Sequence, residues 1–195
     1  MVDVRIHGRG GQGVVTTAEV LALACFIEGR HAQALPSFGS ERTGAPVVAF
    51  CPIADTPIRL REPIMAPDAL IIQDPTLLHQ VDVFSGLSAS GYILINTAKT
   101  FADLGLLEFA RGFRPERLLT VPATELALGH VGRPLPNAAL LGAFAALGGV
   151  ISLDAVLSAI RARFSGKVAQ GNAAAAAEAH RIVLEERQQA EASHA

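Results

Sequence analysis

"VDVRIHGRGGQGVVTTAEVLALACFIEG", residues 2–29, decides the fold because its periodicity changes at a turn that contains four glycines. Residues 2–7 alternate between apolar and polar side chains, which predicts a strand. Residues 14–27 carry apolar side chains at helical spacing, and Gly29 follows where a C-cap is expected. The chain is therefore predicted to open with a strand, a glycine-rich turn and a helix, the unit from which α/β folds are built.

Gly8, Gly10 and Gly13 match the G-x-G-x-x-G pattern of dinucleotide-binding loops. Glycine there allows a tight turn, lets backbone N–H groups face an anion, and lets the helix pack closely on the strand. The pattern also requires an acidic residue about 20 positions later, at the tip of the second strand. Here the second extended segment, residues 30–39, has no carboxylate, and Glu28 precedes it. The sequence therefore disfavours NAD as the ligand of this loop.

Two interpretations of the loop stay open. The loop binds a ligand that bears an anionic group, or it contacts only the backbone of another polypeptide. The guanidinium of Arg9 suits a carboxylate or phosphate, and Gln12 adds an amide at the start of the helix. Both residues favour recognition of a polar group by the loop. His7 ends the first strand beside it, so its imidazole is expected either to contact a ligand or to donate to a carbonyl.

The remaining chain alternates between apolar runs and helical patterns. Strands are expected at residues 45–53, 67–75 and 91–97, an extended piece paired with the first of these at 56–64, a strand followed by a helix within 117–128, and three helices from residue 136 onward. Because two of the runs have no polar interruption, they predict parallel strands buried on both faces. The predicted fold is α/β and Rossmann-like, with a mostly parallel sheet, helices on both faces and a helical C-terminal region. We expect one domain over 1–195, with a frayed tail at 190–195.

Composition excludes some classes of function. The 195 residues carry a net charge of -2 without a dense basic run, so no nucleic-acid partner is expected. Half of the residues are hydrophobic and 17% are charged, which indicates extensive burial against other proteins or simply alanine richness. No signal-peptide pattern or membrane-length apolar run is present, so we expect a cytoplasmic protein. Cys25 and Cys51 are isolated in apolar segments, which predicts buried, inert thiols and no metal site or cluster in this chain alone.

Residues 8–22, "GRGGQGVVTTAEVLA", and 35–50, "LPSFGSERTGAPVVAF", resemble the gamma subunit of 2-oxoacid:ferredoxin oxidoreductases of the pyruvate and ketoisovalerate type. The resemblance continues through 56–78 and 91–97. It resumes in "PNAALLGAF", 136–144, and "IRARFSGKVAQGN", 160–172, and so spans nearly the whole chain. Thr43 departs from the family pattern, because a second arginine usually stands there; any anion contact at that position is in doubt.

The resemblance implies a place in a multi-subunit oxidoreductase. Enzymes of this family decarboxylate a 2-oxoacid on thiamine diphosphate with Mg²⁺, pass electrons through 4Fe-4S clusters to ferredoxin, or to NAD through an FAD-containing subunit, and release an acyl-CoA and CO2. It implies alpha, beta and delta subunits as partners. This chain has neither the G-D-G…N thiamine motif nor a cysteine cluster, so it is expected to be inactive alone. The alternatives are a free-standing nucleotide- or CoA-binding module and a purely structural subunit.

By the same resemblance, two segments are candidate sites. The loop is assigned as cofactor-binding or cofactor-proximal, through Gly8, Arg9, Gly10, Gly11, Gln12 and Gly13. The second segment is assigned to a subunit interface or a cofactor-proximal position, through Ser37, Phe38, Ser40, Glu41 and Arg42. No residue of this chain alone is assigned a catalytic role, since Ser37 and Ser40 lack the G-x-S-x-G context of an activated nucleophile.

Polar residues at other strand tips are weaker candidates. Asp74 ends an apolar run, where it faces the crevice or caps the short helix that follows. Asn96 and Lys99 stand at another strand tip. Asn137 begins a predicted helix, and its expected role is an N-cap.

Overall fold

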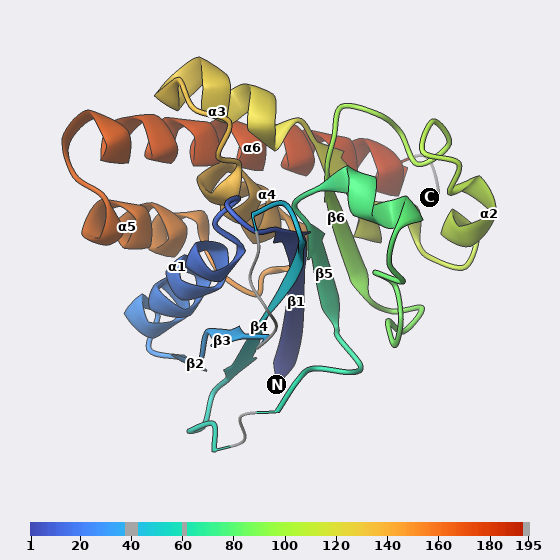
Figure 1. Ribbon diagram of the computed structural model, residues 1–195, viewed down its shortest axis with the longest axis horizontal. Helices are drawn as coiled ribbons and strands as arrows, with labels where there is room; N and C mark the ends of the chain where they lie inside the picture. The colour runs from blue at the N-terminus through green and yellow to red at the C-terminus, as the bar shows by residue number, and fades with distance from the viewer. Residues whose placement is uncertain (38–42, 60–61, 193–195) are drawn as a thin grey trace.

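The protein is described by a computed structural model over residues 1–37, 43–59 and 62–192. Seven strands form one sheet in the order β2-β4-β1-β5-β6-β7, with β3 also paired to β4 (Figure 1). The strands are β1 (Val2–Arg9), β2 (His31–Ala32), β3 (Leu35–Pro36), β4 (Pro46–Ala54), β5 (Ala69–Ile72), β6 (Tyr92–Asn96) and β7 (Leu118–Val121). The predicted α/β class with a mostly parallel sheet is confirmed.

Strand β4 is the exception to the parallel arrangement among the described strands. It pairs antiparallel with β1, from Val2 opposite Ile53 to Arg9 opposite Pro46. The short strands β2 and β3 are antiparallel to β4 in turn, so they run in the same direction as β1. Pairs β1–β5, β5–β6 and β6–β7 are parallel. A strand therefore lies between β1 and β2 where a doubly wound sheet would pair the two directly.

The prediction that residues 56–64 form an extended piece paired with β4 is wrong, because the described residues of this segment, 56–59 and 62–64, belong to no strand. Pro57 and Pro63 have no backbone N–H to contribute to a ladder, which disfavours a paired strand there. The side chain of Gln33 instead donates to the carbonyl of Ile58 at 3.0 Å. The segment after β4 is thus attached to the sheet edge by a side chain rather than by strand pairing.

The helices follow the predicted order. They are α1 (Val14–Ile27), α2 (Leu107–Ala110), α3 (Ala123–Val131), α4 (Asn137–Gly148), α5 (Leu153–Arg163) and α6 (Gly166–Ala192), with short 3-10 helices η1 (Pro75–His79) and η2 (Pro115–Arg117). The three helices expected after residue 136 are confirmed. Helix α6 continues to Ala192, and the rest of the expected frayed tail lies outside the described residues. None of the described helices combines the length and apolar character needed to cross a membrane.

The two faces of the sheet are covered differently. Strand residues such as Ile71 and Leu94 belong to a large core that includes buried residues of α1, α4, α5 and α6. Their neighbours Ile72 and Ile95 belong to a small core on the opposite face, packed against short segments and α2. In Figure 1, α1 and α5 lie on one side of the strands and α2 on the other. Among the residues that the structure describes, long helices therefore cover one face of the sheet, and short helices and turns cover the other.

Candidate functional site

The glycine loop lies at the end of β1 away from the N-terminus, where β1 passes into α1 (Figure 1). Gly11 and Gly13 have φ of 92° and 71°, a left-handed backbone that L side chains rarely adopt. A Cβ atom on Gly8 would lie 2.5 Å from Cγ2 of Val14, so helix α1 approaches the strand more closely than any other residue there would allow. The predicted strand–turn–helix unit is confirmed, and glycine is favoured by the local geometry at Gly8, Gly11 and Gly13.

The loop is joined to the residues just before β4. The N–H of Gly10 donates to the carbonyl of Ala45 at 2.9 Å, and the N–H of Gly44 donates to the carbonyl of Gly10 at 3.0 Å. Gly10 also forms a parallel bridge with Thr43. The described end of the segment before β4 therefore lies beside the glycine loop.

The other residues predicted in that segment are only partly placed. Ser37 is exposed, and its N–H donates to the carbonyl of Val48 at 2.9 Å. The candidates outside the described residues are Phe38, Ser40, Glu41 and Arg42.

Arg9 uses its guanidinium within the chain. Its Nε donates to Asp74 at 3.1 Å, and its Nη1 donates to the carbonyl of Gly44 at 2.9 Å. Its Nη2 donates to Thr76 at 2.7 Å and to Gln80 at 2.8 Å. The side chain therefore ties the loop to η1 and to the segment before β4, and these bonds occupy the planar fork that could otherwise bind an anion.

Of the two roles that the sequence leaves open for Asp74, the structure shows the cap of the short helix η1. Its carboxylate accepts from the N–H of Thr76 at 2.9 Å, which caps η1, and from the amide of Gln12 at 2.7 Å. Burial favours the neutral form, but hydrogen bonds from Thr76 and Gln12 and the charge of Arg9 outweigh it and lower the pKa of Asp74. The residue is therefore a carboxylate that anchors the loop from below.

Gln12 closes the loop on itself. Its side-chain Oε1 accepts from the N–H of Arg9 at 2.8 Å, while its Nε2 donates to Asp74. Both the oxygen and the nitrogen of this amide, which the sequence suggested as a recognition group, are therefore bonded within the chain. What remains for a ligand is the backbone of the loop and of the first turn of α1.

Asn137 is not an N-cap, contrary to the expectation. Pro136 holds the cap position of α4, and Asn137 is the first residue of the helix without a capping bond. Its Nδ2 instead donates to the carbonyls of Gly13 at 2.7 Å and Gln12 at 3.1 Å, and to Oγ1 of Thr17 at 2.8 Å. The beginning of α4 therefore supports the glycine loop.

Gln73 completes this support, and the sequence reasoning missed it. Its Nε2 donates to the carbonyl of Gln12, and its Oε1 accepts from the hydroxyl of Thr17 at 3.1 Å. Gln73 is 1% exposed and follows the last residue of β5. A buried polar residue at the tip of an apolar strand is the signal that could have identified it.

His7 contacts another side chain of β1. Its Nε2 accepts from Nε of Arg5 at 3.0 Å, and burial, followed by the charge of Arg5, lowers the pKa of His7 to about 4. Arg5, which the sequence reasoning also missed, donates to the backbone carbonyls of Val83 at 3.0 Å and Ser85 at 2.6 Å. His7 is therefore a neutral hydrogen-bond acceptor that helps hold a buried arginine.

The candidates at the next strand tip are separated. Asn96 is buried, donates to the carbonyl of Gln73 at 2.9 Å and to Thr124 at 2.8 Å, and so joins β6 to the start of α3. Lys99 is exposed, and its backbone N–H donates to Oγ1 of Thr97. Asn96 is thus bonded to Gln73, which supports the loop, whereas Lys99 lies on the exposed surface.

A hollow of about 310 Å3 remains open beside the loop. It is lined by Arg9, Gly10, Gly11, Gly13, Val14, Val15, Thr16 and Val47. Within the described residues, the N–H groups of Gly11, Gly13 and the first three residues of α1 have no hydrogen-bond partner. Free N–H groups at the positive end of a helix dipole are suited to an anion. The arrangement can bind a phosphate or carboxylate, and the described lining of the hollow contains no general acid or base.

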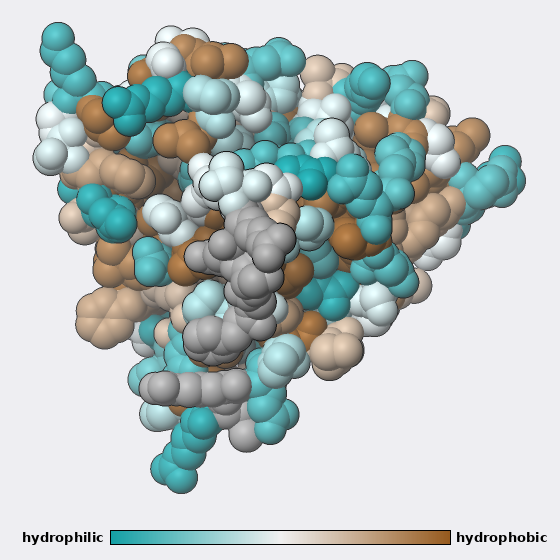
Figure 2. Space-filling view, viewed as in Figure 1, coloured by the Kyte–Doolittle hydropathy of each residue, from teal (hydrophilic) through white to brown (hydrophobic). Residues whose placement is uncertain are grey.

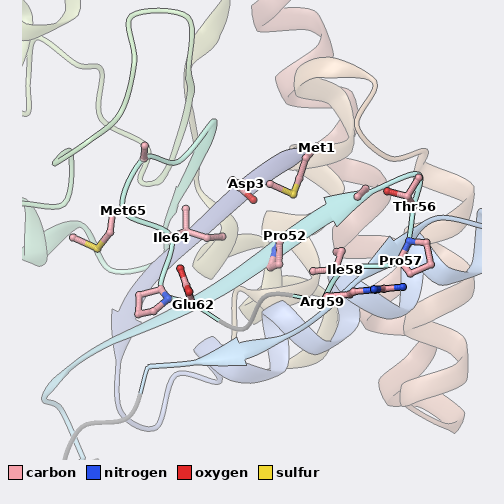
Figure 3. Close-up of a pocket in the computed structure, with 13 residues that line it drawn as sticks. Met1, Asp3, Pro52, Thr56, Pro57, Ile58, Arg59, Glu62, Ile64 and Met65 are labelled. Atoms are coloured by element: carbon pink, nitrogen blue, oxygen red, sulfur yellow. The ribbon is translucent and has the colours of Figure 1, made fainter.

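A second hollow, of about 330 Å3, lies at the opposite end of β1 (Figure 3). Residues of β1, β4 and the segment after β4 surround it, among them Asp3, Pro52 and Ile58. Most of its described lining is apolar or proline, so it gives no catalytic arrangement.

The two cysteines are buried in the large core. Burial raises the pKa of Cys25 to about 11 and raises that of Cys51 well above its ordinary value. The prediction of buried, inert thiols is confirmed, since thiolate is the reactive form. Over the described ranges, no group of three or more histidine, cysteine or acidic residues could hold a metal ion.

The comparisons with known proteins agree in one direction. The family model for pyruvate ferredoxin/flavodoxin oxidoreductase matches residues 3–182. Pyruvate synthase subunit PorC of Methanothermobacter marburgensis is 46% identical over 90% of this chain and 94% of its own length. The common gamma subunit of pyruvate/ketoisovalerate oxidoreductases of Pyrococcus abyssi is 46% identical over 92% of this chain and 95% of its own.

A solved relative supports the same grouping. The crystal structure of pyruvate oxidoreductase subunit PORC of Thermotoga maritima superposes with a TM-score of 0.78 at 32% identity, over 92% of this chain and 95% of that one. The resemblance found in the sequence blocks is thus confirmed over nearly the whole length. The chain belongs to the pyruvate ferredoxin/flavodoxin oxidoreductase family, among its gamma-type subunits.

Proposed function

We propose that this chain is the gamma subunit of a complex that oxidatively decarboxylates a 2-oxoacid to an acyl-CoA and CO2. Electrons leave to ferredoxin, or to NAD through a flavin-containing subunit. The observation that carries the proposal is the glycine loop, where side chains are bonded inside the chain and backbone N–H groups remain open. Such a loop can bind and position an anionic group but cannot transform it, which suits a subunit of an oxidoreductase that is inactive alone.

In this proposal thiamine diphosphate, Mg²⁺ and the 4Fe-4S clusters belong to the alpha, beta and delta subunits. The described residues do not fit these groups, because Cys25 and Cys51 are buried in the core and no cluster of potential metal ligands exists among them. Thiamine diphosphate supplies the carbanion chemistry and the clusters carry the electrons. The residues of this chain contribute binding and subunit contact.

We assign the glycine loop, Gly8 to Gly13, to the neighbourhood of CoA. CoA carries several phosphate groups, and a phosphate matches the free N–H groups at the start of α1 in charge and in hydrogen bonding. Ser37, Phe38, Ser40, Glu41 and Arg42 are assigned to the subunit interface beside it, because Thr43 and Gly44 join the end of that segment to the loop.

Large apolar side chains on the surface support the proposal that this chain contacts other proteins. Phe26 is 74% exposed and Met65 is 75% exposed, although water disfavours large apolar side chains at such positions. In Figure 2, brown apolar patches lie between teal hydrophilic ones across the face shown. We therefore propose that the 195 residues act as one subunit domain within a cytoplasmic complex.

Purification of the complex tests the proposal. A tag on this chain should retain larger partners in equal copies, together with iron and thiamine diphosphate. The complex should reduce ferredoxin or a viologen dye when given CoA and a 2-oxoacid, with pyruvate and 2-ketoisovalerate tried first. A colourless single chain that binds CoA would instead establish a free-standing binding module.

Substitution in the loop tests the assignment to CoA. Gly11→Ala introduces a side chain at φ of 92° in the wall of the hollow, so it should raise KM for CoA several-fold without changing KM for the 2-oxoacid. Gly29→Ala is the matched control, because Gly29 has φ of 77° and no neighbouring atom within 4 Å of an added Cβ. An unchanged KM for CoA in the Gly11 variant, with the complex intact, would leave the loop as a purely structural contact.

A further inference from the structure

Two side-chain amides, that of buried Gln73 and that of half-buried Asn137, converge on the loop from elements that are distant in sequence. Asn137, at the start of α4, lies 124 positions after Gly13, and Gln73 follows β5. Both donate to the carbonyl of Gln12, and Asn137 also donates to the carbonyl of Gly13. Two successive peptide carbonyls are therefore held toward the interior, that of Gln12 by the two amides and that of Gly13 by Asn137 together with the N–H of Thr17, which donates to it at 2.9 Å.

The orientation of these carbonyls determines where the N–H groups point. In a trans peptide the carbonyl and the N–H of the same unit point in opposite directions. The carbonyl of Gln12 shares its peptide with the N–H of Gly13, and the carbonyl of Gly13 shares its peptide with the N–H of Val14. Because both carbonyls are bound inside, both N–H groups are turned outward. Gly13 and Val14 line the open hollow, in agreement with this orientation.

We propose that Asn137 and Gln73 are positioning residues, which preset the N–H groups of Gly13 and Val14 for an anionic group of the ligand. Successive N–H groups held in this way form a concavity for an anion, and presetting them removes the cost of ordering the loop on binding. Gly13 permits this because a Cβ there would lie 2.8 Å from Nδ2 of Asn137. This inference rests on the proposed function, in which the ligand is CoA.

The substitution Asn137→Asp tests it in the purified complex. The aspartate keeps the shape but loses both donors, and its oxygens face two carbonyls, so the peptides should turn. We expect KM for CoA to rise at least tenfold, with kcat at saturating CoA and KM for the 2-oxoacid within twofold. Asn172→Asp is the matched control, because buried Asn172 likewise donates to a carbonyl, that of Val168, but within α6. It should leave KM for CoA unchanged.

Amide hydrogen exchange of residues 8–16 in the same variants separates this inference from the proposed function. Faster exchange in Asn137→Asp, with no change in KM for CoA, supports the positioning role and counts against CoA as the ligand. Unchanged exchange overturns the positioning role whatever KM does. Asn137→Ala, which removes the donors without adding charge, should also speed amide exchange and raise KM for CoA, but by less than Asn137→Asp. If Asn137→Asp fails to fold, the alanine variant decides in its place.

Discussion

At the scale of single residues, the side chains of Arg9 and Gln12 in the loop are bonded within the chain and are not available to a ligand. The sequence alone favours Arg9 and Gln12 as groups that bind a ligand, yet both side chains are bonded to Asp74. Their role in the structure is to fix the backbone, and the backbone presents the open N–H groups. A glycine-rich turn with polar residues can therefore be a preorganised support rather than a set of recognition side chains.

Gly13→Ala should destabilise the chain more than Gly29→Ala. Both positions have positive φ, 71° and 77°, so each alanine costs roughly 1–2 kcal/mol of backbone strain. Only at Gly13 does the new Cβ also displace Asn137, which should add about 1 kcal/mol for lost hydrogen bonds. Urea unfolding of the two variants measures the difference. An equal decrease in the free energy of unfolding in the two variants would mean that the contact with Asn137 contributes nothing to stability.

His7 should make the chain less stable in mild acid. Its pKa is lowered to about 4 in the folded state, so below its ordinary value of 6.5 the unfolded chain binds a proton that the folded chain does not. The stability it contributes is complete above about pH 6.5 and falls, by on the order of 3 kcal/mol, as the pH approaches 4. His7→Gln keeps an acceptor for Arg5 and should flatten this part of the profile. His31→Gln, at an exposed position, should not.

The sequence identified the members of the loop but not their partners. Glycine spacing and the change of periodicity are local signals, so Gly8 to Gly13 could be predicted from a short stretch. Gln73 and Asn137 reach the loop from positions 61 and 125 residues away from Gln12, and no local pattern reports that distance. Asn137 was misread as a cap because it stands at the start of a helix, where capping is the common role.

At the scale of elements, the packing of α4 against α6 requires a residue without a side chain at position 142. Gly142 lies where an added Cβ would collide with the carbonyl of Ala176, so the two helices touch backbone to backbone. The same contact supports the loop indirectly, because α4 begins at Asn137. Packing between two C-terminal helices is thus connected to the position of a residue in the site.

Gly142→Ala should therefore lower the free energy of unfolding by about 1–3 kcal/mol, the usual cost of an overpacked core. Gly129→Ala in α3 is the control, because it is exposed and an added Cβ meets nothing within 4 Å. There the higher helix propensity of alanine should give a gain of up to about 1 kcal/mol. Thermal and urea unfolding check both values. A Gly142 variant as stable as the parent would show that the helices can separate without cost.

Strand existence was easier to predict than strand direction. Apolar runs identified β4, β5 and β6, and parallel pairing followed correctly for β5 and β6. The run in β4 carries no sign of its antiparallel course, because a side-chain pattern reads the same in both directions. That course is visible only in the pairing of β4 with β1 and β3. The wrong extended piece at 56–64 had the apolar residues of a strand, but its two prolines removed the N–H groups.

At the scale of the whole molecule, the sheet has one face under long helices and one under short segments. The loop and the segment before β4 meet at one edge of this sheet, and large apolar side chains such as Phe26 remain exposed. This distribution fits a subunit that completes its surface by assembly.

We propose that the open N–H groups of the glycine loop are covered when the complex assembles and binds CoA. Hydrogen exchange at residues 10–16, compared between the purified chain and the purified complex with and without CoA, tests it most directly. We predict at least tenfold slower exchange in the complex and a further decrease when CoA is added. Exchange rates that are the same in the free chain and in the CoA-bound complex would contradict the account.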